Sequence, residues 1–293
     1  IIPLFNEFRN IIAQKFLPDA SIFRLIFFMI RLIHNYLEGI RMKRIYYYHQ
    51  TTDDVVDSHN QNFSLPDDYV ILPTSHGAKI WSTIARYLAA SFGWIIFRFF
   101  DNVKVIGKEK LKQVNDGYFI YGNHTRPMGD VFTSLTIFPI KNFYAIANQA
   151  NWGIPFIGKY LVRYGGLPVG KDMKQSIKLI KAIQTVIKDK KGEVLIYPEA
   201  HVWPYYTKIR PFDATSMHFP VKLNAPSFVM TKTYHKRRFI KRPRAVIYID
   251  GPFYPDQTLN RKEAQNKLHD EIWETMNERA KLSDYEYCQY IKK

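Results

Sequence analysis

Short apolar runs alternate with amphipathic segments from about residue 103 onward. The runs that predict strands are VKVIG (103–107), YFIYGN (118–123), FYAIAN (143–148), LPV (167–169), EVLIYPE (193–199), PSFVMTKTY (226–234) and RAVIYID (244–250). Helices are predicted over 130–138, 154–165 and 173–192, and from about Arg261 to Lys281. Strands that alternate with helices in this way predict an α/β fold with a mostly parallel central sheet flanked by helices.

The first hundred residues follow a different pattern. The segments ASIFRLIFFMIRLI (20–33) and YLAASFGWIIFRFF (87–100) are apolar and aromatic, but arginines interrupt them before the roughly 18 apolar residues of a membrane-spanning helix accumulate. Two interpretations carry similar weight: the helices pack on the protein core, or they lie in a membrane interface. We expect membrane-associated N-terminal helices over 1–48, a polar linker over 49–77 and an α/β domain over 78–293.

Composition narrows the class of protein. The 293 residues are 46% hydrophobic and carry a net charge of +16, so we expect a folded protein with an anionic partner. The sole cysteine, Cys288, excludes an internal disulfide framework and a cysteine-based metal site, and is typical of a cytosol-facing protein. The net charge alone does not distinguish nucleic acid, acidic lipid or a phosphorylated substrate.

Candidate chemistry follows the ends of three predicted strands, where reactive groups gather in open α/β sheets. His124 and Asp130 lie in NHTRPMGD (123–130), Lys171 follows GGLPVG, and Glu199 lies in YPEA (197–200). On a continuous helix, His124 and Asp130 would point about 240° apart, so they can meet only across a loop. Histidine is the natural general base near neutral pH, and a carboxylate would orient it. Lys171 is suited to neutralise a phosphate, and Glu199 to hold a hydroxyl or brace the histidine loop.

The order of these motifs resembles the phospholipid/glycerol acyltransferase family, which includes lysophosphatidate acyltransferases. The resemblance covers roughly residues 100–255, and this chain departs from the family pattern in several places. One extra residue separates His124 from Asp130, Ala200 replaces a glycine, and APSFVM has one proline where the family pairs two. These departures indicate a divergent branch.

The resemblance implies transfer of an acyl group from acyl-CoA or acyl carrier protein, as co-substrate, to a lyso-lipid hydroxyl such as that of 1-acylglycerol-3-phosphate. His124 would deprotonate the hydroxyl and Asp130 would orient His124, with no covalent acyl-enzyme, no further cofactor and no metal. The predicted substrate-binding residues are Asn123, Arg126, Lys171, Glu199, Lys208 and Arg210. The expected location is the cytoplasmic face of a membrane.

Two other functions remain open at this stage. The same His–Asp pair would serve a hydrolase or thioesterase, although the sequence has no Gly-x-Ser-x-Gly elbow. A non-catalytic protein that binds membranes through its basic surface is the other alternative. The run HKRRFIKRPR (235–244) holds six lysines and arginines between two predicted strands. A solvated hairpin tip and a membrane-facing surface both explain that run, and no motif in the sequence supports nucleic-acid binding.

Overall fold

The computed structural model describes residues 44–56, 62–97, 102–126, 130–138, 142–154 and 158–293. The helices predicted within residues 1–43 lie outside these ranges. Residues 43–293 form one compact unit. The predicted domain boundaries at 48 and 77 stay predictions.

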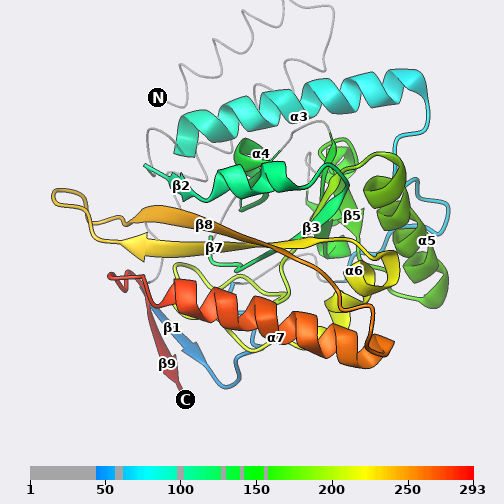
Figure 1. Cartoon of the computed structure of the whole chain (residues 1–293). Helices are drawn as coiled ribbons and strands as arrows, with labels where there is room; N and C mark the ends of the chain where they lie inside the picture. The colour runs from blue at the N-terminus through cyan, green and yellow to red at the C-terminus, as the bar shows by residue number, and fades with distance from the viewer. Residues whose placement is uncertain (1–43, 57–61, 98–101, 127–129, 139–141, 155–157) are drawn as a thin grey trace, which may run out of the picture. The chain divides into compact units, whose positions relative to one another are not determined.

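A seven-stranded sheet forms the centre of this unit (Figure 1), in the order β2-β8-β7-β3-β6-β4-β5. Its strands are β2 (Lys104–Ile106), β3 (Tyr118–Gly122), β4 (Phe143–Ala147), β5 (Gly166–Pro168), β6 (Glu193–Ile196), β7 (Ser227–His235) and β8 (Arg244–Phe253). The five strands from β7 to β5 run parallel, β8 is antiparallel to β7, and β2 is parallel to β8. The predicted mostly parallel α/β sheet is confirmed.

Helices cover both faces of the sheet (Figure 1). The α-helices are α3 (His76–Ile96), α4 (Asp130–Ile137), α5 (Met173–Gln184), α6 (His218–Leu223) and α7 (Arg261–Ala280), and a π-helical turn over Thr185–Asp189 extends α5. Shorter 3-10 turns span Lys108–Gln113, Gln149–Gly153, Gly158–Tyr160 and Ala214–Met217. Ser75 caps α3 by accepting a hydrogen bond from the Ala78 amide, and Asn260 and Glu263 form a capping box at α7.

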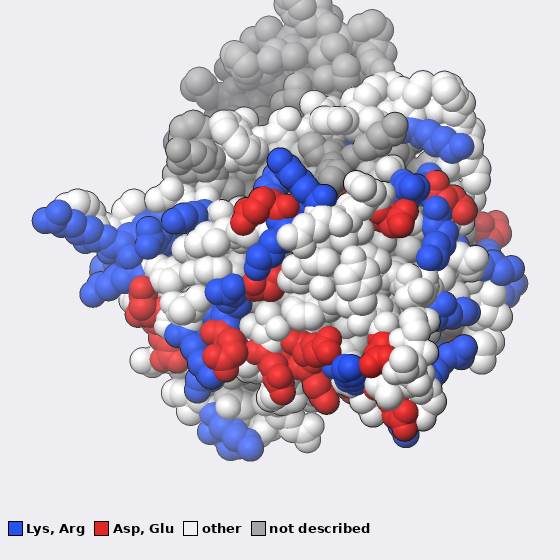
Figure 2. All heavy atoms as spheres, in the orientation of Figure 1, with Lys and Arg blue, Asp and Glu red and all other residues white. Residues whose placement is uncertain are grey.

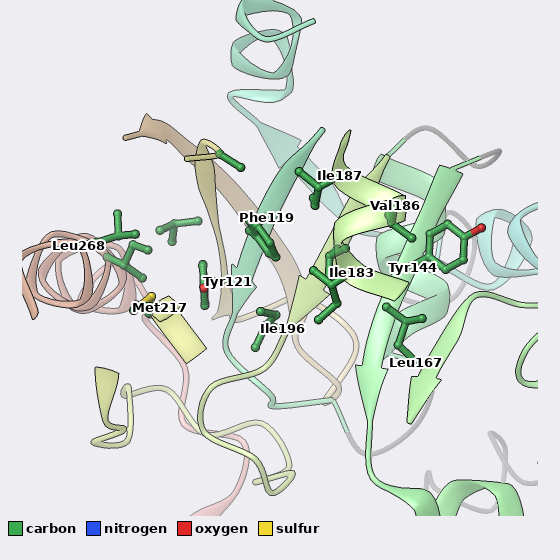
Figure 3. Close-up of a cluster of buried hydrophobic side chains, with 14 of the residues drawn as sticks. Phe119, Tyr121, Tyr144, Leu167, Ile183, Val186, Ile187, Ile196, Met217 and Leu268 are labelled. Carbon is green, nitrogen blue, oxygen red and sulfur yellow. The ribbon is translucent and has the colours of Figure 1, made fainter. Parts of the chain in front are cut away.

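Strands β3, β6 and β7 are buried on both faces of the sheet, so their alternate residues pack into two separate cores. Phe119 and Tyr121 of β3 point toward α5 and α7, in the cluster drawn in Figure 3. Tyr118 and Ile120 point the other way and pack with residues of α3 and α4. This two-sided burial explains why the strands read as continuous apolar runs. It fixes the carboxyl end of β3, where the candidate site begins.

A small second sheet joins the two ends of the described chain. Strand β1 (Ile45–Tyr48) pairs in parallel with β9 (Gln289–Lys292). Tyr290 of β9 stacks on Trp203 with ring centroids 4.8 Å apart, and its hydroxyl donates to the Pro204 carbonyl at 2.7 Å. The Trp203 amide in turn donates to the His124 carbonyl at 3.0 Å. The second sheet therefore supports the loop that carries His124.

The predicted helix over 154–165 is wrong in its described part. Residues 158–160 form a 3-10 turn and turns follow to Gly165, which has φ +90°. A Cβ on Gly158 would stand 1.9 Å from the Trp152 carbonyl oxygen, so this glycine allows a close backbone approach that a helical pattern does not reveal.

Residues of the predicted linker make hydrogen bonds to the α/β body. The Thr51 carbonyl accepts from Arg210 at 3.0 Å, and the Asp53 carbonyl accepts from the Trp203 indole at 2.8 Å. The Leu65 amide donates to the Gln149 side chain at 2.8 Å. The described parts of residues 49–77 therefore pack against the α/β fold through these hydrogen bonds.

Candidate active site

His124 and Asp130 meet at the carboxyl end of β3. His124 lies two residues beyond the strand, and Asp130 is the first residue of α4. The His124 Nδ1 atom lies 2.8 Å from the Asp130 Oδ2 atom, which also accepts from the Arg126 amide at 3.1 Å. The predicted contact across a loop is confirmed. The His124 side chain is 20% exposed and that of Asp130 only 2%, so a substrate can reach the imidazole while the carboxylate stays inside.

Lys232 of β7 supplies a buried cation to the other oxygen of this carboxylate. Its Nζ atom forms an ion pair with the Asp130 Oδ1 atom, and the lysine side chain is 1% exposed. Burial favours the neutral form of Asp130, but the Lys232 ammonium and the hydrogen bond with His124 together hold its pKa well below the usual range. Asp130 is therefore an anion at neutral pH. It accepts the Nδ1 proton of His124, which leaves the Nε2 lone pair free to act as a base.

Asn123 fixes the position of Lys232 relative to the histidine loop. Its Nδ2 atom donates to the Lys232 carbonyl at 2.9 Å, and its Oδ1 atom accepts from the Lys232 amide at 2.8 Å. The buried amide side chain thus replaces a rung of the ladder between β3 and β7. This arrangement gives Asn123 a positioning role, in place of the substrate contact expected from the sequence.

Glu199 and Arg210 form a second buried ion pair behind His124. Glu199 accepts from the His124 amide at 3.1 Å and from the Arg210 amide at 2.9 Å. The Arg210 Nη2 atom lies 3.4 Å from the Glu199 Oε2 atom, and the two side chains are 1% and 0% exposed. Burial raises the pKa of Glu199, while Arg210 opposes that effect.

The geometry favours the bracing role for Glu199 over a direct contact with a hydroxyl. Arg210 is directed into the protein, where it also donates to the carbonyls of Thr51 and His201. Neither side chain reaches the surface beside His124. Both hold the loop in place.

Two further features shape the histidine loop. The Tyr197 ring stacks on the His124 imidazole with centroids 4.2 Å apart and planes at 9°. Ala200, which replaces the family's glycine, has φ +63°. Alanine is strained in this left-handed region, whereas glycine is not. Ala200 therefore occupies a backbone conformation that favours glycine, the residue of the family motif.

Of the remaining predicted residues, one lies at the site and two lie away from it. Arg126 stays at the site: its guanidinium covers the Phe97 ring at 4.0 Å, and its Nη1 atom lies 3.4 Å from the Thr133 hydroxyl. Lys171 follows β5, three strands from β3 or about 14 Å along the sheet, and donates to the Phe63 carbonyl at 2.6 Å. Lys208 is exposed on the surface of the Trp203 loop. Neither lysine contacts His124.

Sequence reasoning missed Lys232 and a basic hollow beside it. The hollow is lined by Arg126, Lys232, Tyr234 and Arg242. Two of these residues, Arg126 and Lys232, also contact Asp130. Lys232 could have been found from its place inside a nine-residue strand that is buried throughout. A buried lysine requires an anionic partner, and this would have indicated a carboxylate nearby. Within the described ranges, no three His, Cys, Asp or Glu side chains are arranged to hold a metal ion.

The comparisons with known proteins agree with the site. Residues 102–231, which contain both His124 and Asp130, match the family model described as Acyltransferase. This part of the chain is therefore similar to the acyltransferase family, as its motifs indicated. Its fold is similar to the crystal structure of the 1-acyl-sn-glycerophosphate (LPA) acyltransferase PlsC from Thermotoga maritima. That match has a TM-score of 0.50 and 17% sequence identity, and covers 70% of this chain and 83% of the other. No curated protein matches the sequence significantly.

Proposed function

We propose that this protein transfers a fatty acyl group from an acyl thioester to a hydroxyl of a lyso-lipid, such as 1-acylglycerol-3-phosphate. The observation that carries the proposal is the 2.8 Å contact between His124 and the ionised, buried Asp130 inside the region that matches the acyltransferase family. Acyl-CoA and acyl carrier protein both fit as donors.

The reaction follows from this geometry. The Nε2 atom of His124 removes the acceptor's hydroxyl proton as the oxygen attacks the thioester carbonyl carbon. Asp130 stabilises the imidazolium that forms. The C–S bond then breaks, and the leaving thiolate takes the proton from His124. The products are an ester and a free thiol, and no covalent acyl-enzyme forms.

The exposed side of α3 supports placement at a membrane surface. Its large exposed apolar residues follow a helical spacing that is interrupted once, between Leu88 and Trp94. They are Ile80, Trp81, Ile84, Tyr87, Leu88, Trp94 and Ile95. Such a stripe suits a helix that lies in the lipid interface. Among the helices described, none combines the length and apolar character needed to cross a bilayer. The cytoplasmic face is the side that the lone cysteine favours.

Acceptor-dependent thiol release tests the proposal. The purified chain is incubated with a long-chain acyl-CoA, with and without lyso-lipids, and the free thiol and the acylated lipid are measured. We expect thiol release that requires an acceptor and matches ester formation mole for mole. Thiol release at the same rate without acceptor would indicate the hydrolase alternative, and no release with any donor would contradict both.

A further inference from the structure

The connection between β7 and β8, residues 236–243, projects from the sheet as a basic tip with an apolar apex. Phe239 is 87% exposed and Ile240 is 55% exposed. Lys236, Arg238 and Lys241 beside them are also exposed. Figure 2 shows basic side chains gathered on this protruding tip, at the left where Figure 1 places the β7–β8 connection.

The tip lies at the same edge of the sheet as His124. Strand β7 runs parallel to β3, so the residues that follow both strands leave the sheet in the same direction. The hydroxyl groups of Tyr234 and Thr125, which adjoin the tip and the histidine loop, lie 2.9 Å apart. Arg242 and Pro243 at the base of the tip line the basic hollow that reaches Lys232 and Arg126.

Contacts with the C-terminal segment hold the base of the tip in place. Asp284 pairs with His235 at 2.8 Å and accepts from the Lys236 amide at 2.9 Å. The Tyr285 hydroxyl donates to the Lys241 carbonyl at 3.1 Å. The apex therefore projects from a fixed base, with its aromatic and aliphatic side chains directed into solvent.

We propose that residues 236–242 are a docking surface for an anionic lipid bilayer. Phe239 and Ile240 enter the acyl boundary, while Lys236, Arg238 and Lys241 bind the headgroup phosphates. A bilayer fits both halves of this surface, because it offers apolar depth beneath a layer of negative charge. Nucleic acid would pair with the cations but would leave the aliphatic Ile240 without a comparable partner.

Docking through this tip turns the edge of the sheet that carries His124 toward the lipid. An acceptor in the bilayer could then present its hydroxyl to the imidazole without leaving the membrane. The docking itself does not depend on acyl transfer, so vesicle binding tests it separately from the proposed function.

A fluorescent label at the apex provides the direct test. The native Cys288 is buried, so a Cys288→Ala background accepts one environment-sensitive label through Phe239→Cys. The matched control is Tyr254→Cys, since Tyr254 is 59% exposed and follows β8 at the opposite edge of the sheet. With vesicles of phosphatidylcholine and phosphatidylglycerol, we expect a blue shift and severalfold brighter emission from the label at 239 and no change at 254.

Two results would overturn the proposal. In the first, the protein does not sediment with these vesicles. In the second, the protein binds but the emission of the label at 239 stays the same as in water. A pair of charge reversals gives a second reading. Arg238→Glu with Lys241→Glu should weaken vesicle binding about tenfold or more. Lys188→Glu with Lys191→Glu makes the same charge change near the opposite edge and should have a much smaller effect. Tighter binding to single-stranded RNA than to vesicles, with a response of the label at 239, would assign the surface to nucleic acid instead.

Discussion

Lys232 connects the interior of the sheet to the candidate catalytic pair. Its ammonium faces Asp130. The other titratable side chains near the His124–Asp130 pair lie on adjoining elements and are Glu199, Arg126, Tyr197 and Tyr234. Burial alone would raise the pKa of Asp130, and the Lys232 ammonium opposes that rise, so this cation keeps Asp130 ionised beside His124.

Replacing Lys232 with methionine should therefore change the pH dependence of turnover. With the cation gone, burial should raise the pKa of Asp130, so the carboxylate is lost at a higher pH and the acid limb of the kcat/KM profile should move to higher pH. The uncompensated Asp130 should also lower the free energy of unfolding by about 3–5 kcal/mol. Thr231→Val, in the same strand and without a charge change, is the control. An unchanged acid limb in a folded Lys232→Met variant would show that Lys232 only stabilises the fold.

Ala200 gives a stability prediction at the same scale. Holding a non-glycine residue at φ +63° costs about 1–2 kcal/mol of stability. Glycine avoids this strain, but it makes the unfolded chain more flexible, which lowers stability by about 0.4–1 kcal/mol relative to alanine. Ala200→Gly should therefore raise the free energy of unfolding by roughly 0.5 kcal/mol. Urea denaturation measures this difference. A loss of stability would mean that the Ala200 methyl group contributes packing that outweighs its backbone strain.

At the scale of elements, β6 begins with a buried acid at the end of the sheet opposite His124. Glu193 is 3% exposed, and its Oε2 atom has no hydrogen-bond partner among the described residues. Burial raises the pKa of Glu193 to about 8 from an ordinary value of 4.5. The folded protein thus holds this proton more tightly than the unfolded chain, and stability should fall as pH rises from about 4.5 to about 8.

Glu193→Gln should remove this part of the pH dependence. Between pH 5 and pH 8, the free energy of unfolding of the variant should rise by a few kcal/mol relative to that of the wild type, since one pKa unit corresponds to about 1.4 kcal/mol. Chemical denaturation at both pH values measures the gain. Equal slopes of stability against pH in the two proteins would show that Glu193 is hydrated and titrates normally.

The strands of the large sheet were predictable because burial on both faces produces uninterrupted apolar runs such as YFIYG and EVLI. The hydrogen bond between His124 and Asp130 was also predictable, from the strand end and the helix-breaking residues between them. Lys232 was not, because its partner lies 102 positions away and only strand pairing brings them together. The burial of Arg210 was not predictable for a similar reason. Its sequence neighbours suggest a surface loop, whereas its side chain packs against Glu199 and Trp203.

At the scale of the whole molecule, the net charge of +16 and the exposed apolar side of α3 predict two contributions to membrane binding. Charge attraction is screened as the Debye length falls from about 8 Å at physiological salt to about 3 Å at 1 M salt, whereas apolar insertion persists. Binding to anionic vesicles should therefore weaken with salt without vanishing. Sedimentation across a salt series measures it, and complete release at high salt would indicate an interaction through charge alone.

The most direct test of acyl transfer by the His–Asp pair is the acceptor-dependent rate of the His124→Ala variant, measured as thiol release from acyl-CoA. His201→Ala is the matched control, because His201 lies in the neighbouring loop with a side chain that is 41% exposed. Loss of the general base should slow His124→Ala by about 10²- to 10⁴-fold, with an unchanged circular dichroism spectrum and near-normal activity in the control. A folded His124→Ala variant that transfers acyl groups at the wild-type rate would contradict the assignment.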